Sequence, residues 1–156
     1  MITKNSGIIL GAMAFEGNPY DGHTLLPQLE QVSDILGKLP KVALVDRGYR
    51  GRKTIHGVEI RIPGSGKGRT AYEKLKDRAR FRRRAAIEPV IGHLKSDYRM
   101  IRNYLKGVEG DMINTIMAAV AFNMMKRLRQ IRDAIYFVLD LLTGYRPVKY
   151  ITVLIY

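Results

Sequence analysis

A proline interrupts the longest helical pattern of this 156-residue chain and limits how the segment can fold. Helix-forming residues, many of them Arg or Lys, run from Thr70 to about Asp97, with Pro89 among them. A proline inside a helix removes one backbone hydrogen bond and collides here with the carbonyl of Ala85, which costs about 3 kcal/mol or bends the helix. We therefore predict one kinked helix or two helices, the second beginning near Pro89. Either arrangement bends the chain beside Glu88.

Three charged residues around this proline would share one face of a continuous helix. Each helical residue advances by about 100°, so spacings of four and seven place Arg84, Glu88 and Lys95 within about 40° of one another. A carboxylate between two cations suits a metal-binding acid that works beside a phosphate backbone. If the helix is interrupted, only Glu88 and Lys95 keep a common face. The simpler alternative makes Glu88 an i, i+4 ion-pair partner of Arg84, worth about 0.2–0.5 kcal/mol.

The charge of the chain indicates a polyanionic partner. There are 27 Lys and Arg against 14 Asp and Glu, a net charge of +13 with a pI near 10.2. Such a balance is typical of nucleic-acid-binding proteins. Between Lys67 and Lys106, thirteen Lys and Arg stand against four Asp and Glu. A solvated helix face is the alternative, but the clustering favours a DNA-facing surface, with the candidate contacts Arg80, Arg82, Arg83, Lys67 and Arg99.

Composition excludes several classes of protein. The chain has no cysteine, so it has neither disulfides nor thiolate metal sites, and a reducing compartment is favoured. No apolar stretch reaches the ~20 residues that span a membrane. Hydrophobic residues make up 46% of the chain, which is typical of a globular protein rather than a disordered one. The length predicts one domain or part of one.

Patterns of strand and helix alternate along the rest of the chain. They predict a strand at Ile8–Phe15, a helix from an N-cap at Thr24 to Gly37, a strand at Val42–Val45, a short helix at Gly51–Ile55, a half-exposed strand at Val58–Ile62, and a helix at Asp111–Arg132 with its methionines in the core. A last strand is predicted at Tyr150–Tyr156. His56 and His93 lack metal-ligand spacing and are predicted to be structural.

An acid closes the most apolar of these strands. Val42–Val45 shows no alternation, as expected for a strand buried on both faces, and Asp46 follows it. Ligands of open α/β sheets bind at the carboxyl ends of strands, so Asp46 is placed for chemistry. The alternative is that Asp46 caps the turn at Gly48. We assign Asp21 and His23, in an earlier loop, to a turn and a cap.

The charged stripe resembles the C-terminal signature of bacterial insertion-sequence transposases of the DDE type. That signature reads Tyr, two residues, Arg, three residues, Glu, six residues, Lys. Arg84, Glu88 and Lys95 match it, and Phe81 stands where the tyrosine is usual.

Two upstream segments resemble the same family. Residues 42–51 are similar to the strand that carries the second catalytic Asp and its Gly-Tyr turn. Residues 17–25 resemble the loop after an earlier strand. The three matches occur in the expected order and cover roughly Ser6 to Arg129.

The resemblance implies an α/β fold, with an incomplete RNase H-like mixed sheet flanked by helices, among them a long basic helix and a C-terminal helix. Residues 1–132 would form part of the catalytic domain, and residues 133–156 a tail of unknown role. The implied function is DNA transposition by metal-dependent phosphoryl transfer. Asp46 and Glu88 would hold magnesium or manganese, Lys95 would contact a DNA phosphate, and Arg84 would pair with Glu88 or another phosphate. Transposon ends and target DNA would be the partners, in the bacterial cytoplasm at the nucleoid.

One departure from the family pattern shapes the expected activity. The chain begins at what resembles the third strand, so the first catalytic Asp is missing. Two carboxylates should hold metal poorly, and we expect weak or no activity from the chain alone. An upstream chain could supply the missing acid, and the missing strands would leave an edge that favours self-association. The alternative function is a non-catalytic, basic nucleic-acid-binding module that regulates an intact transposase.

Overall fold

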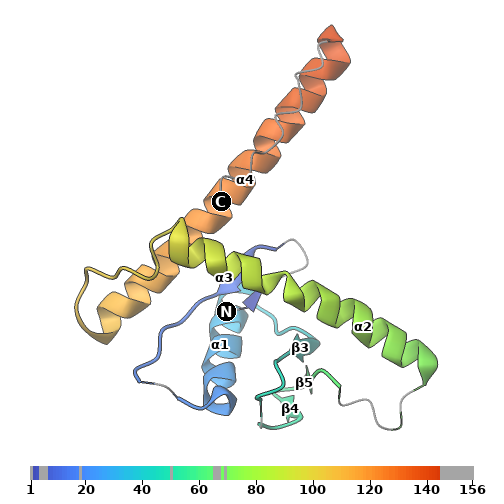
Figure 1. Cartoon of the computed structure of the whole chain (residues 1–156), viewed down its shortest axis with the longest axis vertical. Coiled ribbons are helices and arrows are strands. Elements are labelled where there is room, and N and C mark those ends of the chain that lie inside the picture. Colours follow the sequence, from blue (N-terminus) through green and yellow to red (C-terminus); the bar gives the residue numbers. More distant parts are fainter. Residues whose placement is uncertain are drawn as a thin grey trace. The chain divides into compact units, whose positions relative to one another are not determined.

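The computed structural model describes residues 2–3, 7–17, 19–49, 51–64, 68 and 70–144. Its elements, labelled in Figure 1, are β1 (Ile2–Thr3), β2 (Ile9–Gly11), α1 (Asp21–Leu36), β3 (Val42–Leu44), β4 (Thr54–Ile55), β5 (Val58–Arg61), α2 (Ala71–Ala85), α3 (Ile87–Ser96) and α4 (Gly107–Thr143). The chain divides into two compact units, Met1–Phe122 and Asn123–Tyr156. The predicted division at residue 132 stays a prediction, and the predicted strand at Tyr150–Tyr156 lies outside the described residues.

The central sheet is mixed, as predicted. Its strand order is β3-β5-β4, with β3 parallel to β5 and β4 antiparallel to it. β1 and β2 form a separate antiparallel pair, and β2 covers only three residues of the predicted strand Ile8–Phe15. The structure therefore confirms a mixed α/β fold with flanking helices, while the RNase H-like arrangement stays a prediction.

The prediction of a short helix at Gly51–Ile55 is wrong. The structure has a tight hairpin there instead. β4 and β5 are joined by His56 and Gly57, whose φ angles are 47° and 78°. Two consecutive residues with positive φ make the two-residue turn that matches the twist of antiparallel strands. His56 is thus the first residue of this turn, and its structural role stays a prediction.

Helix α1 begins earlier than predicted. The N-cap position is Tyr20, without a side-chain cap, and Thr24 lies inside the helix, where its hydroxyl donates to the carbonyl of Asp21 (3.1 Å). The predicted N-cap at Thr24 is therefore wrong. The predicted end is confirmed: Gly37 has φ 66°, and its N–H donates to the carbonyl of Ser33 (2.7 Å).

One hydrophobic cluster joins α1 to the three-stranded sheet. Its buried members are Leu29, Tyr49, Val58 and Ile60. Burial alternates along β5, which confirms the predicted half-exposed strand. The prediction that β3 is buried on both faces is wrong, because every residue of β3 is only partly buried. The partial burial follows from the position of β3 as an edge strand of the sheet.

A second cluster joins β2, α3 and the first part of α4. Its buried members are Ile9, Ala12, Leu94, Ala118 and Ala119. The large apolar residues of α4 that the sequence placed in the core are exposed or only partly buried, and this includes its methionines. That prediction is wrong, because the small residues face the cluster. α4 is also longer than the predicted Asp111–Arg132.

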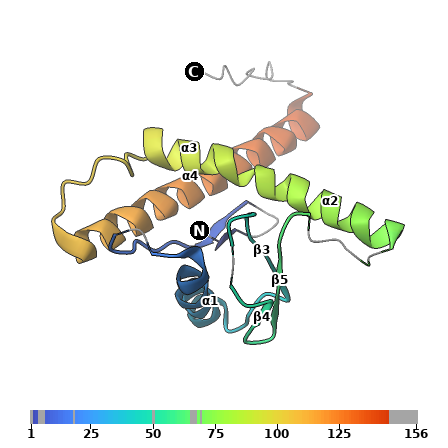
Figure 2. The ribbon, with the colours of Figure 1, turned by 60° about the horizontal axis from the view of Figure 1, so that its bottom comes forward.

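The basic segment forms two helices that run nearly end to end (Figures 1 and 2). Ala86 alone separates α2 from α3. Pro89 is the third residue of α3, in the first turn, where backbone N–H groups have no partner within the helix. The two-helix prediction is confirmed. Among the described residues, no helix has the length and apolar character needed to cross a membrane.

Candidate active site

Asp46 lies two residues beyond the carboxyl end of β3, with its side chain about half exposed (51%). Its Oδ1 accepts a hydrogen bond from the N–H of Gly48 (2.9 Å), so it caps the turn, as one prediction held. Its Oδ2 lies 3.9 Å from Nη2 of Arg84. The carboxylate is thereby fixed by a turn on one side and a cation on the other, while it remains open to solvent.

Arg84 reaches Asp46 because α2 is tied to the neighbouring strand. Asp77 precedes Arg84 by seven residues, so both lie on the same face of α2. Nη1 of Arg61, the last residue of β5, donates to Oδ1 of Asp77 (2.5 Å). α2 therefore carries one ionic contact to the end of β5 and another just beyond the end of β3.

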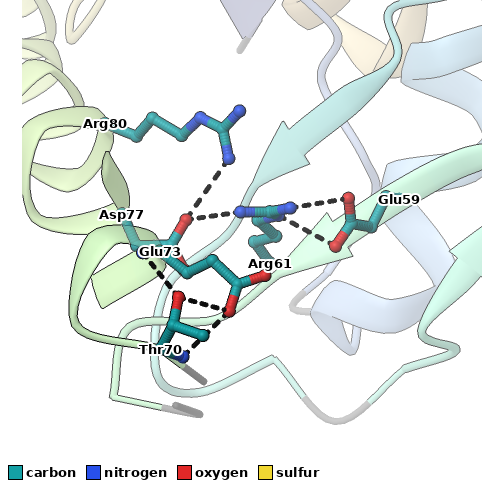
Figure 3. Close-up of polar contacts among 6 residues, drawn as sticks. All are labelled: Glu59, Arg61, Thr70, Glu73, Asp77 and Arg80. Atoms are coloured by element: carbon teal, nitrogen blue, oxygen red, sulfur yellow. Dashed lines mark hydrogen bonds and ion pairs between the residues drawn. The ribbon is translucent and has the colours of Figure 1, made fainter. Parts of the chain in front are cut away.

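Arg61 is the centre of the network in Figure 3. Its Nε and Nη2 donate to Oε1 and Oε2 of Glu59 (2.9 and 3.0 Å). Arg80 Nη1 donates to the same oxygen of Asp77 (3.3 Å). The hydrogen bonds to Glu59, and then the contact with Asp77, raise the pKa of Arg61 despite burial. Asp77 itself is buried, and ion pairs with two arginines compensate its charge.

The start of α2 is fixed by a capping box, also drawn in Figure 3. The N–H of Thr70 donates to Oε2 of Glu73 (2.9 Å), and the N–H of Glu73 donates to Oγ1 of Thr70 (3.3 Å). This reciprocal pair satisfies two backbone donors at the helix start. The first turn of α2 is thus held by this box.

The loop before α1 meets the turn after β3. A β-carbon placed on Gly48 would lie 3.2 Å from Oδ1 of Asp46 and 4.0 Å from Oδ2 of Asp21. A β-carbon on Gly22 would lie 3.5 Å from the Cα of Gly51. Asp21 begins α1, in keeping with the predicted turn, but its carboxylate also faces the same small space as Asp46. The sequence predicts only a turn and a cap for Asp21, and its place beside Asp46 follows from the fold.

Tyr49 is the buried centre of that turn. Its hydroxyl donates to the carbonyl of Arg52 (3.3 Å). Burial, and then the nearby Tyr20, raise the pKa of the Tyr49 phenol, whereas Arg52 lowers it. A β-carbon at Gly51 would overlap the Tyr49 hydroxyl. The absence of a β-carbon at Gly51 therefore leaves room for the tyrosine ring.

Glu88 and Lys95 lie on α3, both exposed. Neither side chain makes a hydrogen bond or ion pair within the described part of the chain. The break at Ala86 separates them from Arg84, whose ion pair is with Asp46 and not with Glu88. The alternative of an Arg84–Glu88 salt bridge is therefore not what the structure contains. Only Glu88 and Lys95 keep the common face that the interrupted helix allows.

Comparison with known proteins adds the family. A family model described as the transposase DDE domain matches residues 1–124. This chain belongs to that family. No curated protein and no solved structure matches it. The resemblance drawn from three short segments is thus confirmed, and the match includes Asp46, Glu88 and Lys95.

The predicted DNA contacts of this transposase domain are found in different environments. Arg80 is tied to Asp77, whereas Arg82 and Arg99 are exposed. Arg99 lies between α3 and α4 with a positive φ of 55°. Arg83 belongs to α2, and Lys67 lies outside the described residues. His93 pairs through Nδ1 with Oδ2 of Asp97 (2.7 Å), which agrees with the structural role predicted for it.

The carboxylates of the transposase domain fit a hard divalent cation in kind, because such cations prefer oxygen ligands. Asp46 and Asp21 face a common space, and Glu88 is an exposed acid without a protein partner among the described residues. Across that part of the chain, no group of three or more Asp, Glu, His or Cys side chains is arranged to hold a metal ion.

Proposed function

We propose that this transposase domain acts in DNA transposition by metal-dependent phosphoryl transfer on transposon-end DNA. The observation that supports this most is the Arg84–Asp46 contact. It joins the segment that carries the Arg-Glu-Lys signature to the acid at the carboxyl end of β3. The family resemblance selects these two segments independently. They thus meet at the carboxyl ends of the strands, where ligands bind in α/β folds.

The proposal gives each residue a role. Asp46 and Glu88 hold magnesium or manganese, which stabilises the attacking and leaving oxygens of the phosphodiester. Lys95 contacts a DNA phosphate beside the cut. Arg84 keeps the Asp46 carboxylate in place, and its remaining N–H groups can bind a phosphate oxygen. The exposed Arg82 and Arg99 contact the DNA backbone, with transposon ends and target DNA as partners at the bacterial nucleoid.

The activity of the chain by itself is proposed to be weak or absent. Asp46 and Glu88 by themselves supply too few oxygen ligands to hold a pair of divalent cations firmly. Cleavage of transposon-end DNA in magnesium by the purified chain alone would contradict this part of the proposal. An upstream polypeptide that supplies a third acid would raise the activity.

Metal binding tests the site directly. We expect manganese, followed by its electron paramagnetic resonance signal, to bind the whole chain weakly and to bind Asp46→Asn and Glu88→Gln more weakly still. Glu109→Gln is the matched control, since Glu109 is also an exposed acid in the first turn of a helix. Equal manganese affinity in Glu88→Gln and the wild type would remove Glu88 from the site.

The alternative function is a non-catalytic nucleic-acid-binding module. The observation in its favour is the basic surface of α2, where Arg82 is exposed. Under this alternative, Glu88→Gln changes neither metal nor DNA binding. Arg82→Ala should lower the slope of log K against log salt by about 0.9 for each DNA phosphate that the side chain neutralises in the wild type.

A further inference from the structure

The last part of α4 exposes apolar residues in a regular pattern. Within the unit Asn123–Tyr156, six of them recur with alternating spacings of four and three, and all are exposed: Met124, Leu128, Ile131, Ile135, Val138 and Leu142. A shallow, open groove on this side of α4 is lined by Ile131, Ala134, Ile135, Val138 and Leu139. A repeat of 3.5 residues is the pattern by which helices pack along one another in coiled coils. Contiguous exposed apolar surface of this kind marks an interaction site.

We infer that this stripe, Met124–Leu142, packs against the same stripe of a second copy in the antiparallel direction. In heptad letters, Leu128, Ile135 and Leu142 occupy a positions and the other three occupy d positions. An antiparallel pair places a opposite d. A twofold axis beside Asp133 then sets Met124 opposite Leu142, Leu128 opposite Val138 and Ile131 opposite Ile135, so every member of the stripe finds a partner.

Charge along the helix favours this direction. Its described charges beyond Asn123 are basic in the first half and acidic in the second: Lys126, Arg127, Arg129 and Arg132, then Asp133 and Asp140. A parallel pair would align the basic halves with each other. An antiparallel pair aligns each basic half with an acidic half of the other copy.

The residues that flank the stripe give the same result. In a parallel pair, the g residue of one heptad faces the e residue of the next, which sets Arg127 against Arg132 on both sides of the seam. In the antiparallel pair, Arg127 faces Ala134 and Leu141. Arg132 approaches its own counterpart near the axis, but Nη2 of each Arg132 is already paired with Oδ1 of Asp133 (2.8 Å). This ion pair lies within one chain and forms in either direction. The parallel pair brings two pairs of arginines together and the antiparallel pair only one, so the flanking charges favour the antiparallel direction.

Association of the whole chain tests the surface. Sedimentation should show dimers, or pairs of dimers. Ile135→Lys should weaken association at least about 100-fold, because a charge would enter the seam of both copies. Phe137→Lys is the control: Phe137 is more exposed than Ile135 (69% against 53%) but lies off the stripe. Circular dichroism verifies that both variants remain helical. A monomeric wild type, or equal effects of the two variants, overturns the inference.

Single cysteines test the direction, since the chain has none of its own. Ala134 lies beside the axis of the antiparallel pair, so Ala134→Cys should form a disulfide between copies under mild oxidation. Leu128→Cys should not, because two Leu128 side chains meet only in a parallel pair. The reverse result overturns the antiparallel assignment.

Removal of residues 145–156 tests a different occupant of the stripe. Association should persist in the shortened chain. If the whole chain is monomeric and the shortened chain associates, those residues cover the stripe and the inference is wrong.

Discussion

Asp77 should contribute more to stability than the other acids of the Arg61 network, because it alone among them is buried. Breaking a fully buried ion pair costs about 3–5 kcal/mol, whereas exposed pairs contribute about 0–1 kcal/mol. The Asp77 and Arg61 side chains are 11% and 19% exposed, and Arg61 keeps its two hydrogen bonds to Glu59. We therefore expect Asp77→Ala to lower the free energy of unfolding by about 2–3 kcal/mol, between those limits.

Urea denaturation followed by circular dichroism measures this change, and the melting temperature should fall by about 5–10 °C. Asp133→Ala is the control, because Asp133 also pairs with an arginine (2.8 Å) but is 64% exposed. Its cost should stay below about 0.5 kcal/mol. Equal losses in the two variants would refute the argument that burial of Asp77 anchors α2 to the sheet.

A double variant separates the pair from its surroundings. Arg61→Met combined with Asp77→Leu removes both charges, and apolar residues can replace a buried pair at little cost. The double variant should therefore unfold at higher urea than Asp77→Ala alone. The losses of unfolding free energy in Arg61→Met alone and Asp77→Leu alone are then compared with the loss in the double variant. If the two single losses add up to the loss of the double variant, the residues are not coupled.

Three further perturbations follow from the turns and from Tyr49. Gly57→Ala should cost about 1 kcal/mol in thermal unfolding, because Gly57 has φ 78°. Gly51→Ala should cost about 1–3 kcal/mol in urea, because its β-carbon overlaps the hydroxyl of buried Tyr49; an unchanged midpoint would show that the ring moves freely. The raised pKa of Tyr49 adds stability that is complete below pH ~10 and declines as the pH rises above that value. Unfolding of Tyr49→Phe between pH 8 and 11 should lack this component of the decline.

The features that sequence predicted correctly depend on neighbours along the chain. Alternation along Val58–Ile62 records one face packed on a cluster that includes Leu29 and the other half open. Pro89 interrupts a helix wherever the rest of the chain lies, because its ring collides with the carbonyl four residues earlier. Asp46 was placed at a strand end because Val42–Val45 is a short apolar run, and the structure puts β3 there.

The features that sequence missed depend on residues far apart in the chain. Asp77 matters because β5 places Arg61 against it, and nothing within α2 indicates that partner. The spacing of seven residues between Asp77 and Arg84 indicates only that the two side chains share one face of α2. Asp21 faces Asp46 only once α1 packs on the sheet. Likewise, periodicity identified an apolar face on α4 but not whether the chain itself covers it.

The two hydrophobic clusters differ in how much chain each must close, and this has a kinetic consequence. The cluster around Leu29 and Val58 draws all its members from Leu25 to Ile62, whereas the other joins Ile9 to Ala119 and Phe122. Local contacts cost less loop-closure entropy and form sooner. During synthesis, the turn that holds Asp46 can therefore fold before α2 has left the ribosome, and Arg84 arrives at an acid that is already in place.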